Sequence, residues 1–236
     1  MKFIALKSLF ALFAFAGALV SAAEVRTYEI NVGEFTELKV TNGIRVDYRV
    51  SEDSCGYAVF NASSDMASAI MASTNKNCLT LQLSAEGISK TDIPRVTVYS
   101  RFLQKVENEG DSLIKVINPA GVPVFRAKVI GNGQIAVHGI NANSVEASLT
   151  TGNGTVLVTG TTTQAKYNLL GTGSIQCADL KASDVKCKLM GTGYIECWAT
   201  QKLSVVGASS GKVYYRNEVP EIKNNSIGVK VLRIEE

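Results

Sequence analysis

Two heptapeptides, GTGSIQC from Gly171 and GTGYIEC from Gly191, stand twenty residues apart and differ at only two positions. Similar glycine turns lie on both sides of them. The last glycines of these turns follow one another at intervals of 23, 21, 19, 20 and 18 residues: Gly110, Gly133, Gly154, Gly173, Gly193 and Gly211. A near-constant period of this length is typical of stacked repeats, so it constrains the fold more than any other feature of the chain.

Apolar residues recur in phase with the glycines. Two residues after the last glycine of successive turns stand Ile135, Val156, Ile175, Ile195 and Val213. A second run alternates before the next turn, for example at Val145, Ala147 and Leu149. Alternation with a period of two is the pattern of a strand with one buried face.

Short strands joined by glycine turns at this period predict a parallel β-solenoid, in which the five apolar residues form one interior ladder. The turn glycines would form the corners, where positive φ or the close approach of a neighbouring corner excludes a Cβ atom. The glycines expected to have this structural role are Gly131, Gly133, Gly152, Gly154, Gly171, Gly173, Gly191, Gly193 and Gly211.

The same glycines do not fit common nucleotide-binding and calcium-binding motifs. A dinucleotide fingerprint needs a third glycine three residues after the second, but Gln176 and Glu196 stand there within strand-like runs. A P-loop needs Gly-Lys followed by Ser or Thr, which no turn has. The calcium-binding β-roll requires an Asp after its glycines, where Ser174 and Tyr194 stand instead. We therefore expect no cofactor.

The first 23 residues have the pattern of a secretory signal peptide. Lys2 and Lys7 precede the apolar run LFALFAFAGALV, and the small residues SAA follow before Glu24. A spanning helix needs about 20 apolar residues, which this run does not reach and no later segment matches. We expect an exported protein, periplasmic, outer-surface or secreted, with no membrane-spanning segment once the signal is removed.

The charge balance bears on possible partners. Without Lys2 and Lys7 the 24 Lys and Arg residues fall to 22, against 21 Asp and Glu. No stretch of the sequence concentrates the basic residues, whereas nucleic-acid-binding proteins usually have a basic patch or stripe. We therefore expect no nucleic-acid partner.

Five cysteines in an exported chain are interpreted against an oxidising compartment. Cys55 and Cys78 each precede a strand-like run, so a Cys55–Cys78 disulfide and two buried thiols are both open. Cys177 and Cys197 hold equivalent places in adjacent repeats and are expected to be packed interior thiols, with a disulfide between them as the alternative. Only Cys187 is obviously near them, which is too few ligands for zinc, so we expect no metal site.

The front of the mature chain, residues 24–107, is strand-rich but lacks the glycine period. FTELKVTNGIRVDYRV, from Phe35, carries Thr41-Asn42-Gly43 between alternating runs, which indicates a hairpin or another tight turn. We place the glycine-cornered coils and a C-terminal cap in residues 108–236. The cap is expected around Pro220, because an open solenoid end needs protection against association.

The chain resembles a known bacterial family. The resemblance lies in FTELKVTNGIRVDYRV, the CLTLQL strand, RVTVYSRFLQKVENEGD and the repeated GNG and GTG coils. The family is described as putative auto-transporter adhesin, head GIN domain, and the resemblance runs from about Phe35 to the end of the chain. It implies an all-β fold, a right-handed parallel β-helix of about five coils with a strand-rich N-terminal portion. It supplies no catalytic motif to carry over.

Parallel β-helices also include enzymes that cleave polysaccharides. Asp179, Lys181 and Asp184 are the residues that a hydrolase or lyase would use here, but a solvated turn explains them as well. Outward Thr, Ser, Asn and Gln residues suit binding, and Trp198 is a weak candidate for stacking on a sugar or anchoring a partner. We expect a non-catalytic, adhesin-like protein that binds an extracellular glycan or a surface protein; the alternatives are a polysaccharide-active enzyme and a purely structural envelope component.

Overall fold

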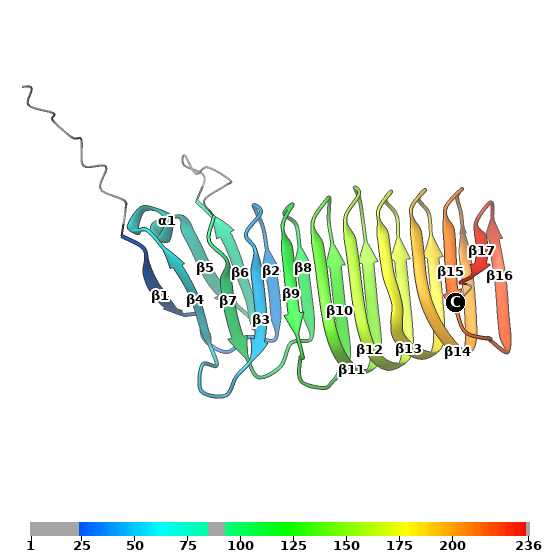
Figure 1. Ribbon diagram of the computed structural model, residues 1–236, viewed down its shortest axis with the longest axis horizontal. Helices are drawn as coiled ribbons and strands as arrows, with labels where there is room; N and C mark the ends of the chain where they lie inside the picture. The colour runs from blue at the N-terminus through cyan, green and yellow to red at the C-terminus, as the bar shows by residue number, and fades with distance from the viewer. Residues whose placement is uncertain (1–23, 85–92, 235–236) are drawn as a thin grey trace, which may run out of the picture.

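The computed structural model describes residues 24–84 and 93–234, and the expected signal peptide lies outside them. The fold is nearly all β, with one short helix, α1 (Ser64–Ala69), and forms a β-solenoid of about six turns (Figure 1). The strands of the front part are β1 (Arg26–Asn31), β2 (Glu37–Val40), β3 (Val46–Val50), β4 (Tyr57–Ala62), β5 (Ile70–Asn75), β6 (Cys78–Leu83), β7 (Val96–Ser100), β8 (Lys105–Asn108) and β9 (Leu113–Ile117). The later strands are β10 (Val122–Val129), β11 (Gln134–Leu149), β12 (Thr155–Leu169), β13 (Ser174–Leu189), β14 (Tyr194–Ala208), β15 (Lys212–Arg216), β16 (Glu221–Ile227) and β17 (Lys230–Arg233).

Each long strand, β11 to β14, crosses two faces of the solenoid, and the pairing register shifts at the bend between them. The first face, as we call it, is the stack of β3, β9, the opening segments of β11 to β14, β15 and β17. The second face is the stack of β2, β8, β10, the closing segments of β11 to β14, and β16. All of these neighbours are parallel, as the period predicts.

The interior consists of apolar columns that run along the solenoid. Ile135, Val156, Ile175, Ile195 and Val213 are register neighbours and at most 1% exposed, so the predicted ladder is confirmed. On the second face, Leu149, Leu169 and Leu189 form a similar buried column. Parallel strands about 4.8 Å apart place like side chains in contact, so the repeat of polarity suffices to build the core.

The corners show which physical constraint selects glycine. Among the nine predicted corner glycines, only Gly131 and Gly152 have positive φ, 102° and 79°. At Gly173 the constraint is proximity, because a Cβ atom there would overlap the carbonyl oxygen of Gly154. That oxygen accepts the hydrogen bond from the N–H of Ser174 at 3.0 Å, which fixes the distance between adjacent corners.

The front part adds coils in an order that differs from the chain order. β2 lies between β6 and β8, and β3 lies between β7 and β9, all in parallel pairs. The coil of residues 37–50 is therefore flanked by two coils made later in the chain. Beyond β7, β4 and β1 continue the sheet in antiparallel pairing, β5 pairs antiparallel with β6, and the short helix α1 lies between β4 and β5 (Figure 1).

The Thr41-Asn42-Gly43 segment forms a tight turn but not a hairpin. Asn42 and Gly43 have φ of 58° and 79°, as the sequence predicts for a tight turn. The hairpin interpretation is wrong, because β2 and β3 pair with neighbouring coils instead of each other. The turn is a corner of the solenoid, and hairpins and solenoid corners use the same residues for the same backbone angles.

At the C-terminal end, β16 and β17 complete one more coil. On the second face Val205 is followed by Asn224 and Gly207 by Ser226, whereas Leu203 is followed by Ile222, which is 41% exposed. The side-chain oxygen of Asn224 accepts hydrogen bonds from the N–H and the hydroxyl of Ser226. The last coil thus presents polar groups beside exposed apolar side chains such as Ile227, and the cap around Pro220 stays a prediction.

The disulfide considered between Cys55 and Cys78 is not formed, and both thiols are free. Cys55 lies in the turn before β4, where its thiol donates to the carboxylate of Glu34. Cys78 begins β6 and lies in register with Glu37 of β2. Each cysteine is thus held by its own neighbours in a different part of the front coils.

Cys177, Cys187 and Cys197 are fully buried free thiols. Cys177 and Cys197 are register neighbours, as the repeat predicts, and the interpretation as packed thiols is confirmed. Burial raises the pKa of Cys177 to about 12, so the thiol form is strongly favoured inside the solenoid.

Within residues 24–84 and 93–234, none of the helical structure has the length and apolar character needed to cross a membrane.

Candidate functional site

Trp198 lies at the end of the first face, between two cations. In register it neighbours Lys181 of β13 and Arg216 of β15. The Lys181 ammonium is 5.9 Å and the Arg216 guanidinium carbon 5.6 Å from the centre of the Trp198 ring. These are cation–π distances, and the two cations come from strands on opposite sides of the ring. The aromatic surface that a sugar would stack on is therefore occupied by the protein itself.

Two carboxylates lie around this tryptophan. Asp179 accepts a hydrogen bond from Arg216 at 2.7 Å and is two-thirds exposed. Partial burial, and secondarily the charge of Asp179, raises the pKa of Glu196, while Arg216 opposes the rise. Asp179, Lys181, Glu196, Trp198 and Arg216 form what we call the Trp198 cluster. The Asp179–Arg216 ion pair and the two cation–π contacts join three successive coils at this end of the face.

The residues considered for catalysis are divided between the two faces. Asp179 is held by Arg216 at the end of the first face. Asp184 lies on the second face, in register with Gln164 and Lys202. The structure thus gives Asp179 an arginine partner instead of Asp184. Asp179, Lys181 and Asp184 do not converge on one site.

The second face carries two hollows that meet at Gln164. One has a volume of about 280 Å³ and is lined by Gln164, Ala165, Lys166, Asp184, Val185, Lys186, Lys202 and Ser204. The other has a volume of about 430 Å³ and is lined by Pro123, Val124, Asn143, Ser144, Thr163 and Gln164. Together they extend from β10 to β14 along the solenoid axis, and we call them the trough. Nine of its thirteen lining residues carry amide, hydroxyl or charged groups, and most of the accessible surface between these groups is apolar.

Three lysines gather at one end of the trough. Lys166 and Lys186 are register neighbours on β12 and β13, and Lys202 follows on β14. They are far apart in the sequence, so a search for basic stretches could not find them. The signal was present in the repeat, since aligning outward positions by the glycine period places Lys166 beside Lys186.

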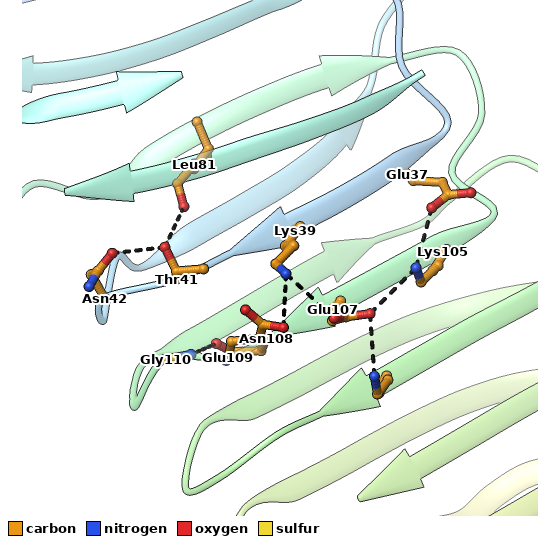
Figure 2. Close-up of polar contacts among 11 residues, drawn as sticks. Glu37, Lys39, Thr41, Asn42, Leu81, Lys105, Glu107, Asn108, Glu109 and Gly110 are labelled. Carbon is orange, nitrogen blue, oxygen red and sulfur yellow. Dashed lines mark hydrogen bonds and ion pairs between the residues drawn. The ribbon is translucent and has the colours of Figure 1, made fainter. Parts of the chain in front are cut away.

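A second set of charges joins the front coils to the later ones, and we call it the junction network. Its centre is Glu107 on β8, whose side chain is only 10% exposed. Figure 2 shows Glu107 between Lys39 of β2 and Lys105, with Glu37 and Glu109 completing the group. The Glu107 carboxylate lies 3.4 Å from Lys105, 3.8 Å from Lys128 of β10 and 3.9 Å from Lys39. One carboxylate thus lies near three ammonium groups from three coils, and Glu109 and Glu37 also pair with Lys39 and Lys105.

Replacing Glu107 by Gln is expected to lower the free energy of unfolding by about 2 kcal/mol, because three lysines would lose their shared counter-charge. The matched control is Glu37→Gln: among the described residues the half-exposed Glu37 carboxylate pairs with Lys105 alone, at 3.4 Å, and its loss should cost about 0.5 kcal/mol. Urea unfolding of the two variants at low salt measures both values. Equal losses would show that the partly buried position of Glu107 carries no special weight.

A family model described as "Putative auto-transporter adhesin, head GIN domain" matches residues 34–218. No curated protein matches. Among solved structures, a putative adhesin from Bacteroides fragilis is similar with a TM-score of 0.80 and 19% identity, covering 90% of this chain and 97% of that one.

Two further solved structures have the same fold. A putative adhesin from Parabacteroides merdae has a TM-score of 0.69 and 19% identity, with 90% of this chain and 97% of that one covered. A putative lipid binding protein from Parabacteroides distasonis has a TM-score of 0.69 and 17% identity, with 89% and 97% covered. At such identities the likeness concerns the fold. The family model, which spans well over half of the sequence, shows that the chain belongs to the family of the putative auto-transporter adhesin, head GIN domain.

Proposed function

We propose that this protein is an exported, non-catalytic, adhesin-like protein that binds a glycan or a protein outside the cytoplasm. The observation that carries the proposal is the trough on the second face, two hollows joined at Gln164. A solenoid supplies a rigid and extended surface of this kind without ordering cost on binding. Family membership supports an adhesin-like role and a location at the surface or outside the cell.

The arrangement of carboxylates supports binding without chemistry. Glycoside hydrolysis usually needs two carboxyl groups that face one bond across about 5–10 Å. Asp184 is the one carboxylate among the residues that line the trough. Asp179 and Glu196 are near each other, but Arg216 is hydrogen-bonded to Asp179 beside them and the cluster lies on the other face.

We further propose that Trp198 stabilises the end of the first face and takes no part in binding, since Lys181 and Arg216 lie over its ring. The trough would then hold the ligand. Gln164 is the residue to change, because it is exposed, lies where the two hollows meet and can be enlarged without disturbing the interior.

The test passes the purified protein over a panel of polysaccharides, cell-wall fractions and immobilised surface proteins. Retention and new sugar ends are recorded in the same samples. We expect retention without new ends, a roughly tenfold weaker retention for Gln164→Trp, and little change for Trp198→Ala. New chain ends would refute the non-catalytic proposal. Loss of retention in Trp198→Ala alone would move the binding site to the first face.

A further inference from the structure

We propose that the trough binds an acidic polysaccharide, whose carboxylate or sulfate groups lie against Lys166, Lys186 and Lys202. This inference rests on the proposed function and specifies the ligand class for the same surface. It is carried by the placement of the three lysines, by the length of the trough and by the chemistry of its other end.

Of the three lysines, Lys186 alone has no ion pair among the described residues. Lys166 and Lys186 are direct neighbours in the ladder, on strands about 4.8 Å apart, and like charges so placed repel each other. Lys186 and nearby Lys188 have no ion pair or hydrogen bond within the part of the chain that the structure describes. An anion beside Lys186 would remove this repulsion. The structure thus leaves the exposed ammonium group of Lys186 available to an anion at one end of the trough.

The other two lysines are held only by exposed, weak ion pairs. Lys166 lies 3.5 Å from Glu146 and is half exposed, and Lys202 lies 3.1 Å from Glu221. Exposed pairs of this kind contribute about 0–1 kcal/mol, so both lysines can turn toward a ligand at small cost. Three cations can then act together on one acidic chain, which also attracts it from a distance.

The trough has the shape and polarity for a sugar polymer. It runs along the solenoid axis, so a ligand lying in it crosses one strand about every 4.8 Å, which is close to the advance of an extended polysaccharide per sugar. Beyond the lysines its lining supplies Asn143, Ser144, Thr163 and Gln164. Their amides and hydroxyls are donors and acceptors suited to sugar hydroxyl groups.

Other anionic partners fit this surface less well. Single-stranded nucleic acids are held by aromatic side chains on which bases stack, and no aromatic residue lines either hollow. A membrane-binding surface would need large exposed apolar side chains beside the cations. The apolar residues that line the hollows are small or medium-sized, and two of them are buried: Pro123, Val124, Ala165 and Val185.

The experiment measures binding of the purified protein to polygalacturonate and chondroitin sulfate, with methyl-esterified polygalacturonate as the uncharged match. The variant is Lys166→Gln/Lys186→Gln. Its control is Lys212→Gln/Lys230→Gln, a pair of exposed lysines that are also register neighbours but on the first face. Oligodeoxythymidylate and phosphatidylglycerol vesicles are included as the competing classes.

We expect binding to at least one acidic polymer, about tenfold weaker binding in Lys166→Gln/Lys186→Gln, and unchanged binding in the control. Raising the salt from about 0.05 to 0.5 M should weaken it, because added ions screen exposed charges. Failure to bind either acidic polymer, equal binding of the esterified polymer, equal losses in both variants, or tighter binding of the oligonucleotide or the vesicles would each overturn the inference. Binding to a neutral glycan or a protein alone would overturn it while leaving the proposed function intact.

Discussion

Gly173→Ala is expected to lower the free energy of unfolding by about 3 kcal/mol, the upper part of the range for overpacking a closed interior. The added methyl group would overlap the carbonyl oxygen of Gly154. It would also lie 2.7 Å from the carbonyl carbon of Asn153, which is too close for two carbon atoms. Both are backbone atoms, so no side chain can turn away to make room. The backbone of two corners must separate, and the hydrogen bond between Ser174 and Gly154 weakens with it.

The control for this variant is Gly121→Ala. Gly121 has no positive φ, and a Cβ atom there would meet only the carbonyl oxygen of Asn141 at 3.5 Å, an ordinary contact. The substitution should therefore be neutral or stabilise the protein by about 0.5 kcal/mol through the unfolded chain. Chemical unfolding monitored by circular dichroism gives both values. A loss below about 1 kcal/mol at Gly173 would show that adjacent corners can move apart, and that close stacking is not why glycine recurs there.

The free energy of unfolding is expected to fall steeply above pH 9, because the solenoid interior contains buried cysteine thiols and a buried tyrosine hydroxyl that ionise in the unfolded chain. Burial raises the pKa of Cys177 to about 12 from an ordinary value of 9.0. Its contact with Cys197, and then burial, raises the pKa of Cys187, while burial raises that of Tyr167. Above pH 9 the unfolded chain releases the Cys177 proton and the folded chain keeps it. Rising pH therefore favours unfolding, by about 1.4 kcal/mol per pH unit and about 4 kcal/mol by pH 12 for this thiol alone.

Urea midpoints measured from pH 8 to pH 11 test this expectation, with Cys177→Val as the comparison. Valine suits the position, because Val137 and Val158 hold the equivalent places in the two preceding coils and are fully buried. The variant should lose one proton's worth of the pH slope while keeping the slope from Cys187 and Tyr167. Identical slopes in the two proteins would mean that Cys177 ionises without unfolding, or that surface groups alone cause the alkaline loss.

The repeat predicted the stacked part of the fold because parallel strands in register need only equivalent polarity at equivalent positions. Ile135 to Val213 followed the glycine period and form one ladder. The front coils carry no such period. Alternation in Val46–Val50 indicates a strand but does not identify its neighbours, and the structure places them at Val96–Ser100 and Leu113–Ile117.

The candidate site was harder to predict from the sequence, because its residues are distant in the chain and become neighbours only through the pairing register of the strands. Alternation predicts that Trp198 points outward, but the cations over its ring stand 17 positions earlier and 18 later. Lys166, Lys186 and Lys202 are likewise separated by a whole coil each. Register shifts at the bends of β13 and β14, such as the one between Cys177 and Lys181, change which residues meet. These shifts are set by packing at the bend and leave no local signal in the sequence.

The position of the coil of residues 37–50 has a consequence for the order in which the chain folds. In most solenoids a newly made coil docks on the one before it, so folding can follow synthesis from the N-terminus. Here β2 and β3 gain parallel partners on both sides only after residue 117 has emerged. The coil of residues 37–50 is thus completed only when distant segments join it, whereas each glycine-cornered coil can dock on the coil made just before it.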